Sequence, residues 1–267
     1  MPELPEVETI VRGLRKNIIG PSISEAKVYF APIVGGKNRF FEKQLKGQKF
    51  TKISRHGKYI KLITNQGKNL LIHLRMTGQL FTALANHQVD KHTHVALTFQ
   101  NGKKLIYRDV RKFGRWTIIP DNKDFSDYIN AGPDALAITQ IELKNLQQRY
   151  PKMKLKVFLL NQTIIAGIGN IYADEICYAL KKHPEVLVEQ IDTQKLYQII
   201  QHILNLSIKH QGTTISDYRT SSRSKGNFQN LLKVYGQKKC QKCKSVVSKI
   251  KVAGRSTHFC SQCQKPC

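Results

Sequence analysis

The chain has 267 residues, 40% of them hydrophobic, so it can bury one large core or two ordinary ones. Lys and Arg number 44 against 18 Asp and Glu, and the resulting formal net charge of +26 indicates a polyanionic partner. We expect neither a membrane span nor a signal peptide, because the sequence has no run of about 18 apolar residues and Glu3, Glu6 and Glu8 interrupt its start. Nucleic acid is therefore the favoured partner.

The chain opens with Met1-Pro2-Glu3. If Met1 is removed, Pro2 carries a secondary amine, which in its neutral form can attack an electrophilic carbon and form an iminium intermediate. An α-amino group titrates near pH 8, so a useful neutral fraction exists at pH 7. Glu3 supplies a neighbouring carboxyl group for proton transfer. Taken alone, a second residue that happens to be proline explains the pattern better, so the rest of the chain must decide.

Residues 5–19 predict an amphipathic helix. Apolar side chains recur at helical spacing between Val7 and Ile18, Pro5 suits a first turn, and Gly20-Pro21 ends the segment. From residue 23 to 120 the pattern changes to short β-rich runs divided by turn signals such as Asn101-Gly102. Strands are expected at 24–30, 49–54, 59–64, 69–75, 93–99, 104–108 and 116–119. This spacing is typical of a β-sandwich or barrel.

Residues 121–134 have the composition of a linker. For the domain boundaries we predict an N-terminal domain of residues 1–124 followed by a linker of residues 125–136. Helices are predicted at 138–149, 152–162, 170–182 and 192–210, within a helical domain of residues 137–230. Residues 212–230 are rich in Ser, Thr, Gly and Asn and predict a mobile loop. Residues 231–267 form the last module. The predicted fold class is α+β, with a β domain, a helical domain and a small appendage.

Five of the six cysteines lie in the last 28 residues. Cys240-x-x-Cys243 and Cys260-x-x-Cys263 are separated by sixteen residues, a spacing at which a hairpin brings four thiolates around one structural Zn²⁺. A pair of disulfides is the alternative, but it needs an oxidising compartment. Cys267 is interpreted as a spare terminal thiol. Cys177 lies in an apolar helical pattern and is predicted to be buried.

A glycine motif, Gly167-Ile168-Gly169-Asn170, precedes the predicted helix at 170–182. Two glycines let a backbone approach closely, and amides at a helix start point toward an anion, so a phosphate fits there. Asn170 is expected to cap the helix and to donate to a phosphate oxygen. An ordinary helix turn is the alternative, and the charge of +26 weakens it.

Three segments, in this order, resemble formamidopyrimidine-DNA glycosylases: PELPEVET (residues 2–9), GIGNIYADE (residues 167–175) and the four-cysteine motif. The resemblance extends over essentially the whole chain. It implies an N-terminal β-sandwich with a leading helix, a helix-two-turns-helix domain with a loop that caps the lesion, and a β-hairpin zinc finger. It also implies an enzyme that excises oxidised purines, such as 8-oxoguanine and formamidopyrimidines, from double-stranded DNA and cuts the strand at the abasic site by β,δ-elimination.

The resemblance implies roles for individual residues. Pro2 is the implied nucleophile and Glu3 the implied acid and base, while Glu6 supports the terminus. Lys58, after the Gly57 turn, is implied in phosphate contact and β-elimination. Arg255, at the tip of the finger hairpin, is implied in DNA binding and δ-elimination.

Further residues are implied as DNA contacts. Met76, Arg111 and Phe113 would fill the gap left by the extruded nucleotide, because a stacked base cannot be attacked at C1′. The remaining implied contacts are His73, His92, Lys152, Lys156 and Asn170, and the loop at 214–218 resembles the segment that closes over the flipped base. His92 and His94 together could instead suggest a metal, although the sequence offers no third ligand.

Val110, Asn161 and Gln237 depart from common family forms, which puts loop geometry in doubt but leaves the reaction class unaffected. Two alternatives remain open: a glycosylase resembling endonuclease VIII that prefers oxidised pyrimidines, and a non-catalytic zinc-finger DNA-binding protein. The expected partner is DNA with an oxidised base or an abasic site, with no membrane association. A monomer in the bacterial cytoplasm, held at the nucleoid by DNA binding, is expected.

Overall fold

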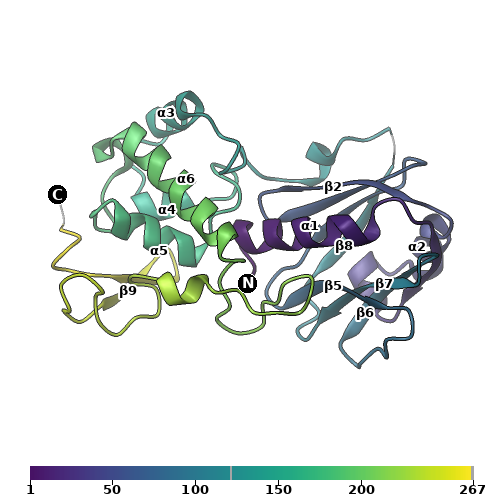
Figure 1. Ribbon diagram of the computed structural model, residues 1–267. Helices are drawn as coiled ribbons and strands as arrows, with labels where there is room; N and C mark the ends of the chain where they lie inside the picture. Colours follow the sequence, from purple (N-terminus) through teal and green to yellow (C-terminus); the bar gives the residue numbers. More distant parts are fainter. Residues whose placement is uncertain (121, 266–267) are drawn as a thin grey trace. The chain divides into compact units, whose positions relative to one another are not determined.

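The computed structural model describes residues 1–120 and 122–265 (Figure 1). Two compact units share these residues: unit 1 consists of Met1–Ile129 with His210–Asn227, and unit 2 of Asn130–Lys209 with Phe228–Cys267. The first boundary lies close to the expected linker. The second differs from expectation, because His210–Asn227, which we assigned to the helical domain, packs with unit 1. Asp121 and Cys267 lie outside the described residues, so the spare thiol stays a prediction.

Unit 1 begins with helix α1 (Leu4–Ile18), which starts directly after Glu3. Its apolar side chains, from Leu4 to Ile18, face the core, and Arg15 and Lys16 lie in the last turn, where cations suit the helix dipole. The helix contacts β2 (Phe50–His56) and β3 (Tyr59–Thr64) of one sheet and β5 (Gly78–Leu84) of the other. The residues before it are therefore held against a rigid β framework.

Two four-stranded sheets form the predicted sandwich. One has the order β1-β6-β7-β5, built from Ile23–Val28, Thr93–Phe99, Lys103–Asp109 and Gly78–Leu84. The other has the order β2-β3-β4-β8, built from Phe50–His56, Tyr59–Thr64, Asn69–His73 and Arg115–Ile119. Every pair of neighbouring strands is antiparallel. All seven expected strands are present.

The sequence missed two elements of unit 1. Strand β5 (Gly78–Leu84) begins with a glycine and carries Gln79 and Thr82 between its apolar residues, so the run is short and mixed. Helix α2 (Asn38–Leu45) buries only Phe41 and Leu45, and two inward side chains give a weak helical period. Short 3₁₀ helices, η1 (Ala31–Val34) and η2 (Phe125–Tyr128), complete the unit, and η2 falls inside the expected linker.

Unit 2 is helical. Its elements are α3 (Gln140–Arg149), α4 (Leu155–Leu160), α5 (Asn170–Ala179), η3 (Val188–Gln190), α6 (Thr193–Lys209) and η4 (Phe228–Leu231). Thr139 caps α3 in a capping box with Glu142. Helix α5 is buried on almost every side, and Cys177 on it is fully buried, as predicted. An irregular segment joins α4 to α5, and the two helices contact each other.

Strands β9 (Ser248–Val252) and β10 (Arg255–Phe259) form the predicted finger hairpin. Val252 pairs with Arg255 across a two-residue turn in which Ala253 and Gly254 both have positive φ. This turn geometry suits the right-handed twist of a hairpin and favours glycine. In the described part of the chain, no helix is long and apolar enough to cross a membrane.

Candidate active site and nucleic-acid interface

The N-terminus is tied to the start of α1. Pro2 is buried, Glu3 is only 3% exposed, and the Glu3 amide donates to Glu6 Oε2 at 2.8 Å. The Glu3 side chain in turn accepts a hydrogen bond from the Glu6 amide, which completes a capping box. The positive end of the helix dipole favours carboxylates at this position. The sequence therefore fixes Glu3 and Glu6 through local helix chemistry.

Glu6 also holds the loop of residues 210–227. Its Oε1 accepts the Thr213 amide at 2.7 Å, and the Tyr218 hydroxyl donates to the Glu6 carbonyl at 3.5 Å. Gly212 has φ +80°, and a Cβ there would lie 2.9 Å from Glu6 Oε1. One buried carboxylate thus links the loop to the residue next to Pro2.

Lys58 lies at the turn between β2 and β3 and is 6% exposed. Gly57 before it has φ +54°, and the Gly57 carbonyl accepts from Arg55 Nη1 at 3.1 Å. Arg55 Nε also donates to Glu8 Oε2 at 3.0 Å, which ties the turn to α1. Partial burial raises the pKa of Glu8, but the Arg12 and Arg55 guanidiniums outweigh it and hold that pKa below its usual range.

His73, at the end of β4, is neutral. Burial, and then the charges of Arg75 and Lys58, lower the pKa of His73 to about 3. Its Nδ1 accepts the Arg75 amide at 3.0 Å, so the proton of the neutral ring belongs on Nε2. The ring packs edge-on against Tyr59 at a centroid distance of 4.6 Å. The geometry therefore leaves His73 with an Nε2–H donor, the form that suits a phosphate oxygen.

Met76, Arg111 and Phe113 are exposed rather than part of the core. Met76 is 42% exposed and Phe113 is 49% exposed, although both are large and apolar. The Arg111 guanidinium lies 4.8 Å from the centre of the Phe113 ring, a cation–π arrangement that holds the two side chains together. Exposed apolar side chains beside an arginine have the chemistry needed to enter a base stack.

His92 is half-buried and His94 is 2% exposed. His94 Nε2 lies 2.7 Å from the Asp109 carbonyl oxygen, so this histidine is satisfied within the sandwich. Among the described residues, only the four finger cysteines form a group of potential metal ligands. The alternative of a metal at His92 and His94 therefore finds no support.

In unit 2, Asn170 is the first residue of α5 and not its cap, since Gly169 occupies the cap position. Asn170 Nδ2 instead donates to the Ser256 carbonyl at 2.9 Å, which joins the start of α5 to the finger hairpin. Asn170 Oδ1 and Ser256 Oγ are buried without a hydrogen-bond partner among the described residues. Gly167, at φ +111°, allows the turn that aims the helix start.

Lys156 differs from expectation most clearly. Its side chain is fully buried, and its Nζ donates to Asp174 Oδ1 at 2.6 Å, Thr257 Oγ1 at 2.7 Å and the Ser256 carbonyl at 3.2 Å. Asp174 Oδ2 accepts the His258 amide at 2.9 Å. The lysine that the resemblance implied as a DNA contact is used inside unit 2, where it joins α4, α5 and β10.

Arg255 and Lys152 are both exposed. Arg255 lies at the start of β10, beside the hairpin turn, as the sequence predicted. The Lys152 side chain is 78% exposed and its Nζ forms an ion pair with Glu189 at 2.8 Å. An exposed ion pair contributes little free energy, so Lys152 can exchange Glu189 for water or a phosphate.

The four finger cysteines converge as a metal site requires. Their sulfur atoms all lie within 4.8 Å of one another, with 3.4 Å between Cys243 and Cys260 and 3.9 Å between Cys240 and Cys263. Ligands at about 2.3 Å from a tetrahedral Zn²⁺ lie about 3.8 Å apart. Burial raises the pKa of Cys240, but backbone amides and the Tyr178 hydroxyl lower it to about 6, whereas burial and the neighbouring thiols raise the pKa of Cys263 to about 12, so four thiolates need a cation among them. The site fits one structural zinc ion.

Comparison with known proteins agrees with this arrangement. Residues 1–116 match the formamidopyrimidine-DNA glycosylase (Fpg) N-terminal domain, and residues 131–219 match the H2TH domain of the same enzymes. Residues 237–266 match the zinc finger found in FPG and IleRS. The chain is 40% identical to the Fpg of Lactococcus lactis subsp. lactis over 99% of this chain and 100% of that protein. The chain belongs to the formamidopyrimidine-DNA glycosylase family.

Other Fpg proteins are similar over their full length. The Fpg of Desulforamulus reducens is 39% identical, with 99% of both chains covered. A structure of Lactococcus lactis Fpg with DNA that contains an abasic site superposes with a TM-score of 0.89 at 36% identity, covering 98% of this chain and 99% of that chain. Another, with DNA that contains an oxidised pyrimidine, has a TM-score of 0.89 at 37% identity, covering 99% and 100%.

The Fpg fold uses acidic residues that the sequence did not mark as important. Asp174 and Glu175 lie within the quoted motif, and Glu175 accepts the amides of Lys233, Val234 and Tyr235 ahead of the finger. Two adjacent carboxylates in an otherwise apolar helix were a usable signal. Asp109, at the end of β7, is also fully buried.

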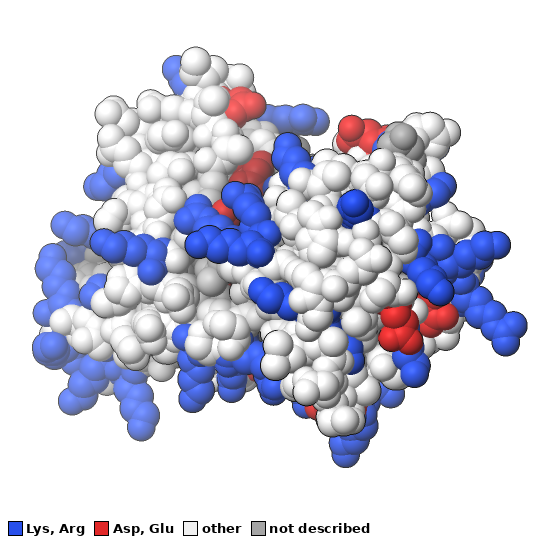
Figure 2. Space-filling view, turned by 45° about the vertical axis from the view of Figure 1, so that its right-hand side comes forward, with Lys and Arg blue, Asp and Glu red and all other residues white. Residues whose placement is uncertain are grey.

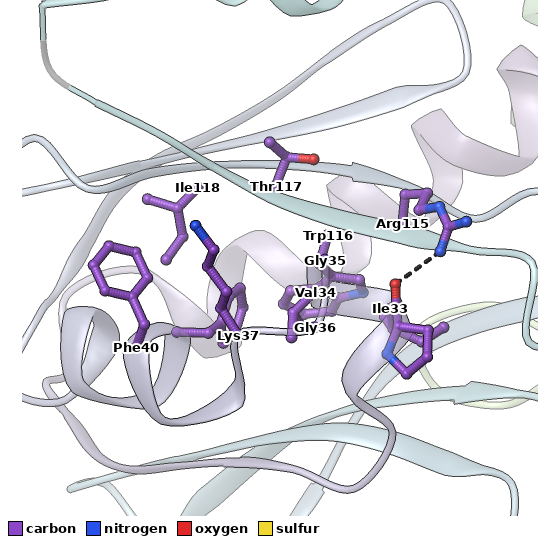
Figure 3. A pocket seen from close by; sticks show the side chains of 12 residues that line it. Ile33, Val34, Gly35, Gly36, Lys37, Phe40, Arg115, Trp116, Thr117 and Ile118 are labelled. Atoms are coloured by element: carbon purple, nitrogen blue, oxygen red, sulfur yellow. Dashed lines mark hydrogen bonds between the residues drawn. The ribbon is translucent and has the colours of Figure 1, made fainter.

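Among the charged side chains on the face in Figure 2, basic groups cover far more of the surface than acidic groups, which form only small clusters. This distribution agrees with the net charge of +26 and suits a nucleic-acid ligand. A groove of about 620 Å³ lies between η1, α2 and β8 (Figure 3). Arg115 Nη1 donates to the Pro32 carbonyl at 2.8 Å across it, and the residues lining it include none of the Fpg site residues named above.

Proposed function

We propose that this Fpg-family chain is a bifunctional DNA glycosylase and AP lyase of base excision repair that removes oxidised purines. The observation that carries the proposal is the Glu3–Glu6 capping box, which holds Pro2 and a carboxylate together at the start of α1. Relatives support the choice of substrate, since one Lactococcus lactis Fpg structure contains Fapy-dG DNA and another contains abasic-site DNA. The proposal requires removal of Met1, because an acylated Pro2 nitrogen is not nucleophilic.

In the proposed chemistry, the neutral Pro2 amine attacks C1′ of the damaged nucleotide and the bond from C1′ to the base breaks. The amine loses its proton, the departing base gains one, and Glu3 delivers a proton to O4′ as the sugar ring opens to the iminium. Removal of a proton from C2′ then expels the 3′ phosphate, and a second elimination expels the 5′ phosphate. Hydrolysis of the iminium regenerates the amine.

The other site residues are proposed to bind DNA around this step. Lys58, His73, Asn170 and Arg255 supply donors for the phosphates beside the lesion, and Lys58 and Arg255 assist the two eliminations. Met76, Arg111 and Phe113 fill the gap in the duplex, while His92 and Lys152 add backbone contacts. Lys156 is proposed to position α5 and the finger, because its charge is already used by Asp174. The loop at 214–218 is proposed to cap the everted base.

A second hypothesis is an enzyme of the same family that prefers oxidised pyrimidines. One observation favours it, namely that a Lactococcus lactis Fpg structure contains DNA with an oxidised pyrimidine. The non-catalytic alternative keeps the zinc finger and the DNA contacts but forms no covalent intermediate. A monomer in the bacterial cytoplasm is proposed for either enzyme, since one lesion needs one set of site residues.

Borohydride trapping tests the proposal. After confirmed removal of Met1, the first tryptic peptide is Pro2–Arg12, which contains no lysine, so a reduced DNA adduct on it identifies the α-amine. We expect the adduct on this peptide with an 8-oxoguanine:cytosine duplex, and a fall of at least tenfold in trapping for Pro2→Gly. An adduct on a lysine peptide would contradict the assignment of Pro2. Absence of any adduct on damaged duplexes would leave the non-catalytic reading.

A parallel assay separates the two enzymatic readings. The protein is given an 8-oxoguanine:cytosine duplex and a thymine glycol duplex of the same flanking sequence, at equal salt, because phosphate contacts make affinity depend on ionic strength. Faster excision of 8-oxoguanine is expected. Faster excision of thymine glycol would replace the purine preference with the pyrimidine preference.

A further inference from the structure

Two loops, residues 74–78 and 109–114, carry the wedge side chains, as we call Met76, Arg111 and Phe113, which are proposed to fill the gap in the duplex. The two loops adjoin paired ends of neighbouring strands. Gly78 at the start of β5 is the register partner of Asp109 at the end of β7. Met76 lies in the first loop, and Arg111 and Phe113 lie in the second. We call these the wedge loops. Their shared base lies inside unit 1.

The Asp109 carboxylate, which is fully buried, joins the two wedge loops. Oδ1 accepts the Thr77 hydroxyl from the first loop and the Arg111 amide, at 3.2 Å, from the second. Oδ2 accepts the Gly114 amide at 2.9 Å and the Tyr107 hydroxyl at 3.0 Å. The Arg111 amide also lies 3.2 Å from Thr77 Oγ1, a direct link between the loops. Four donors therefore converge on one carboxylate.

Packing at the base leaves no room for a side chain at either of two glycines. A Cβ at Gly114 would lie 1.6 Å from the Tyr107 hydroxyl oxygen, and one at Gly78 would lie 2.8 Å from the same atom. The Tyr107 hydroxyl, which in turn donates to Asp109, therefore excludes a side chain at Gly114, and at Gly78 the Leu74 carbonyl oxygen, 2.4 Å from the Cβ position, excludes one as well. Burial, and then the Asp109 charge, raise the pKa of Tyr107 above its usual range, so its hydroxyl remains a donor.

A third segment meets the same residue through its backbone. The Asp109 amide donates to the His92 carbonyl at 2.9 Å, and His94 Nε2 lies 2.7 Å from the Asp109 carbonyl oxygen. His92 is one of the proposed DNA contacts. Backbone and side chain of Asp109 thus connect both wedge loops and the segment that carries His92.

We propose that Asp109 is a positioning residue that locks the wedge loops into one rigid unit, so that Met76, Arg111 and Phe113 enter the duplex together. The proposal rests on the wedge role given under the proposed function. A carboxylate suits this position because all four neighbouring groups are donors and each oxygen accepts two of them, whereas an amide would direct its own N–H₂ at two of these donors. Locking matters only where a stacked base must be displaced.

Asp109→Asn tests this role with two DNA substrates. On an 8-oxoguanine:cytosine duplex, where a base must be extruded, we expect single-turnover excision to fall by tenfold to a hundredfold. On a duplex with an abasic nucleotide facing a one-nucleotide gap, where nothing must be displaced, strand cleavage should fall by less than threefold. A 2-aminopurine beside the lesion should show a smaller fluorescence rise on binding, because it reports insertion of the wedge.

Two further variants keep the test decisive if Asp109→Asn folds poorly. Thr77→Val removes only the hydroxyl that links the first wedge loop to Asp109. Tyr107→Phe removes only the hydroxyl that donates to Asp109 at the shared base of both loops. Each should lower the 2-aminopurine signal and the excision rate by threefold to tenfold, with the abasic-gap rate again spared. Asp127→Asn, the same change of charge at an exposed carboxylate, is the matched control and should behave as wild type.

Three outcomes have distinct meanings. Equal losses on both substrates at an unchanged unfolding midpoint would overturn the proposal, because Asp109 would then act on the chemistry. Unchanged rates and fluorescence in all three variants would also overturn it. If wild-type protein cleaves neither substrate, the proposed glycosylase and lyase function fails instead, while the fluorescence comparison still reports whether Asp109 controls wedge insertion.

Discussion

Lys156 Nζ lies 2.6 Å from Asp174 Oδ1, and both side chains are fully buried in unit 2. The pair is completed by Thr257 and the Ser256 carbonyl, so it connects α4 and α5 to the strand that begins with Arg255. We therefore expect this enclosed lysine to influence DNA binding only through the groups it positions.

Lys156→Met leaves Asp174 buried without its cation and should reduce the free energy of unfolding by about 3–5 kcal/mol. Lys152→Met is the matched control, since its ion pair with Glu189 is exposed and should contribute less than about 1 kcal/mol. Urea denaturation at fixed zinc concentration measures both. Adding Asp174→Asn to Lys156→Met should recover at least half of the loss. A Lys156→Met protein with normal stability but weak DNA binding would show that Lys156 contacts DNA directly.

Replacement of Lys152 should have the opposite effects, with weaker DNA binding and almost unchanged stability. Lys152→Met removes one proposed phosphate contact, so the slope of log affinity against log salt concentration should decrease in magnitude by about 1. Fluorescence anisotropy with a lesion duplex at several salt concentrations measures the slope. An unchanged slope would remove Lys152 from the set of DNA contacts.

Arg55→Met should release the turn that carries Lys58 from α1. The Arg55 side chain is 7% exposed and that of Glu8 is 17% exposed, so loss of the pair should cost about 2 kcal/mol. Arg12→Met breaks the other contact of Glu8, but Arg12 is 59% exposed and should matter by less than about 1 kcal/mol. We expect borohydride trapping to slow about tenfold in Arg55→Met only, because a misplaced turn misplaces Lys58. Equal trapping rates in both variants would contradict this link.

The low pKa of Glu8 adds a pH dependence to the same pair. A carboxyl group with a depressed pKa stabilises the fold above its unfolded value near 4.5, and this contribution is lost as the pH falls through the folded value. The stability difference between wild type and Glu8→Gln should therefore be largest above pH 5 and should shrink below pH 4.5. A difference that stays constant from pH 6 to pH 3.5 would contradict the ion pair.

His73 should make the protein less stable in mild acid. Its pKa is about 3 when folded, against 6.5 for the free side chain, so the unfolded chain takes up a proton first as the pH falls below 6.5. Between pH 6.5 and pH 5.5 the free energy of unfolding should drop by about 1 kcal/mol more in wild type than in His73→Gln. Urea denaturation of the two proteins at both pH values measures this double difference, and parallel curves would contradict the neutral, buried imidazole.

Removal of zinc should unfold the finger and abolish DNA binding without removing a catalytic metal. Four thiolates that lie within 4.8 Å of one another repel strongly without a cation, so Cys260→Ser or a chelator should have the same effect. Metal analysis should give one zinc per chain in wild type and in Cys177→Ala, the control for a buried cysteine outside the cluster. Retained lesion binding in a zinc-free protein would contradict a structural role.

Local rules were enough for much of this protein. The period of apolar residues between Val7 and Ile18 predicts α1, and Asn101-Gly102 predicts the turn between β6 and β7, because each pattern depends on neighbours within one element. Likewise, the spacing of Cys240 and Cys243 predicts a metal turn, since two ligands three residues apart already share one face of a tight turn. By itself, the sequence therefore determined the order of the modules, the sign of the surface charge and the zinc ligands.

Contacts between residues far apart in the chain were decided only by the tertiary structure. Nothing near Lys156 in the sequence indicates that its charge is neutralised by Asp174 and enclosed by Thr257, 101 residues away. In the same way, Asp109 accepts a hydrogen bond from Thr77, 32 residues away, and Glu6 accepts one from Thr213, 207 residues away. Burial of a charge depends on what the fold brings around it, so residue type alone could mark a cation or a carboxylate but could not say whether it faces DNA or the interior.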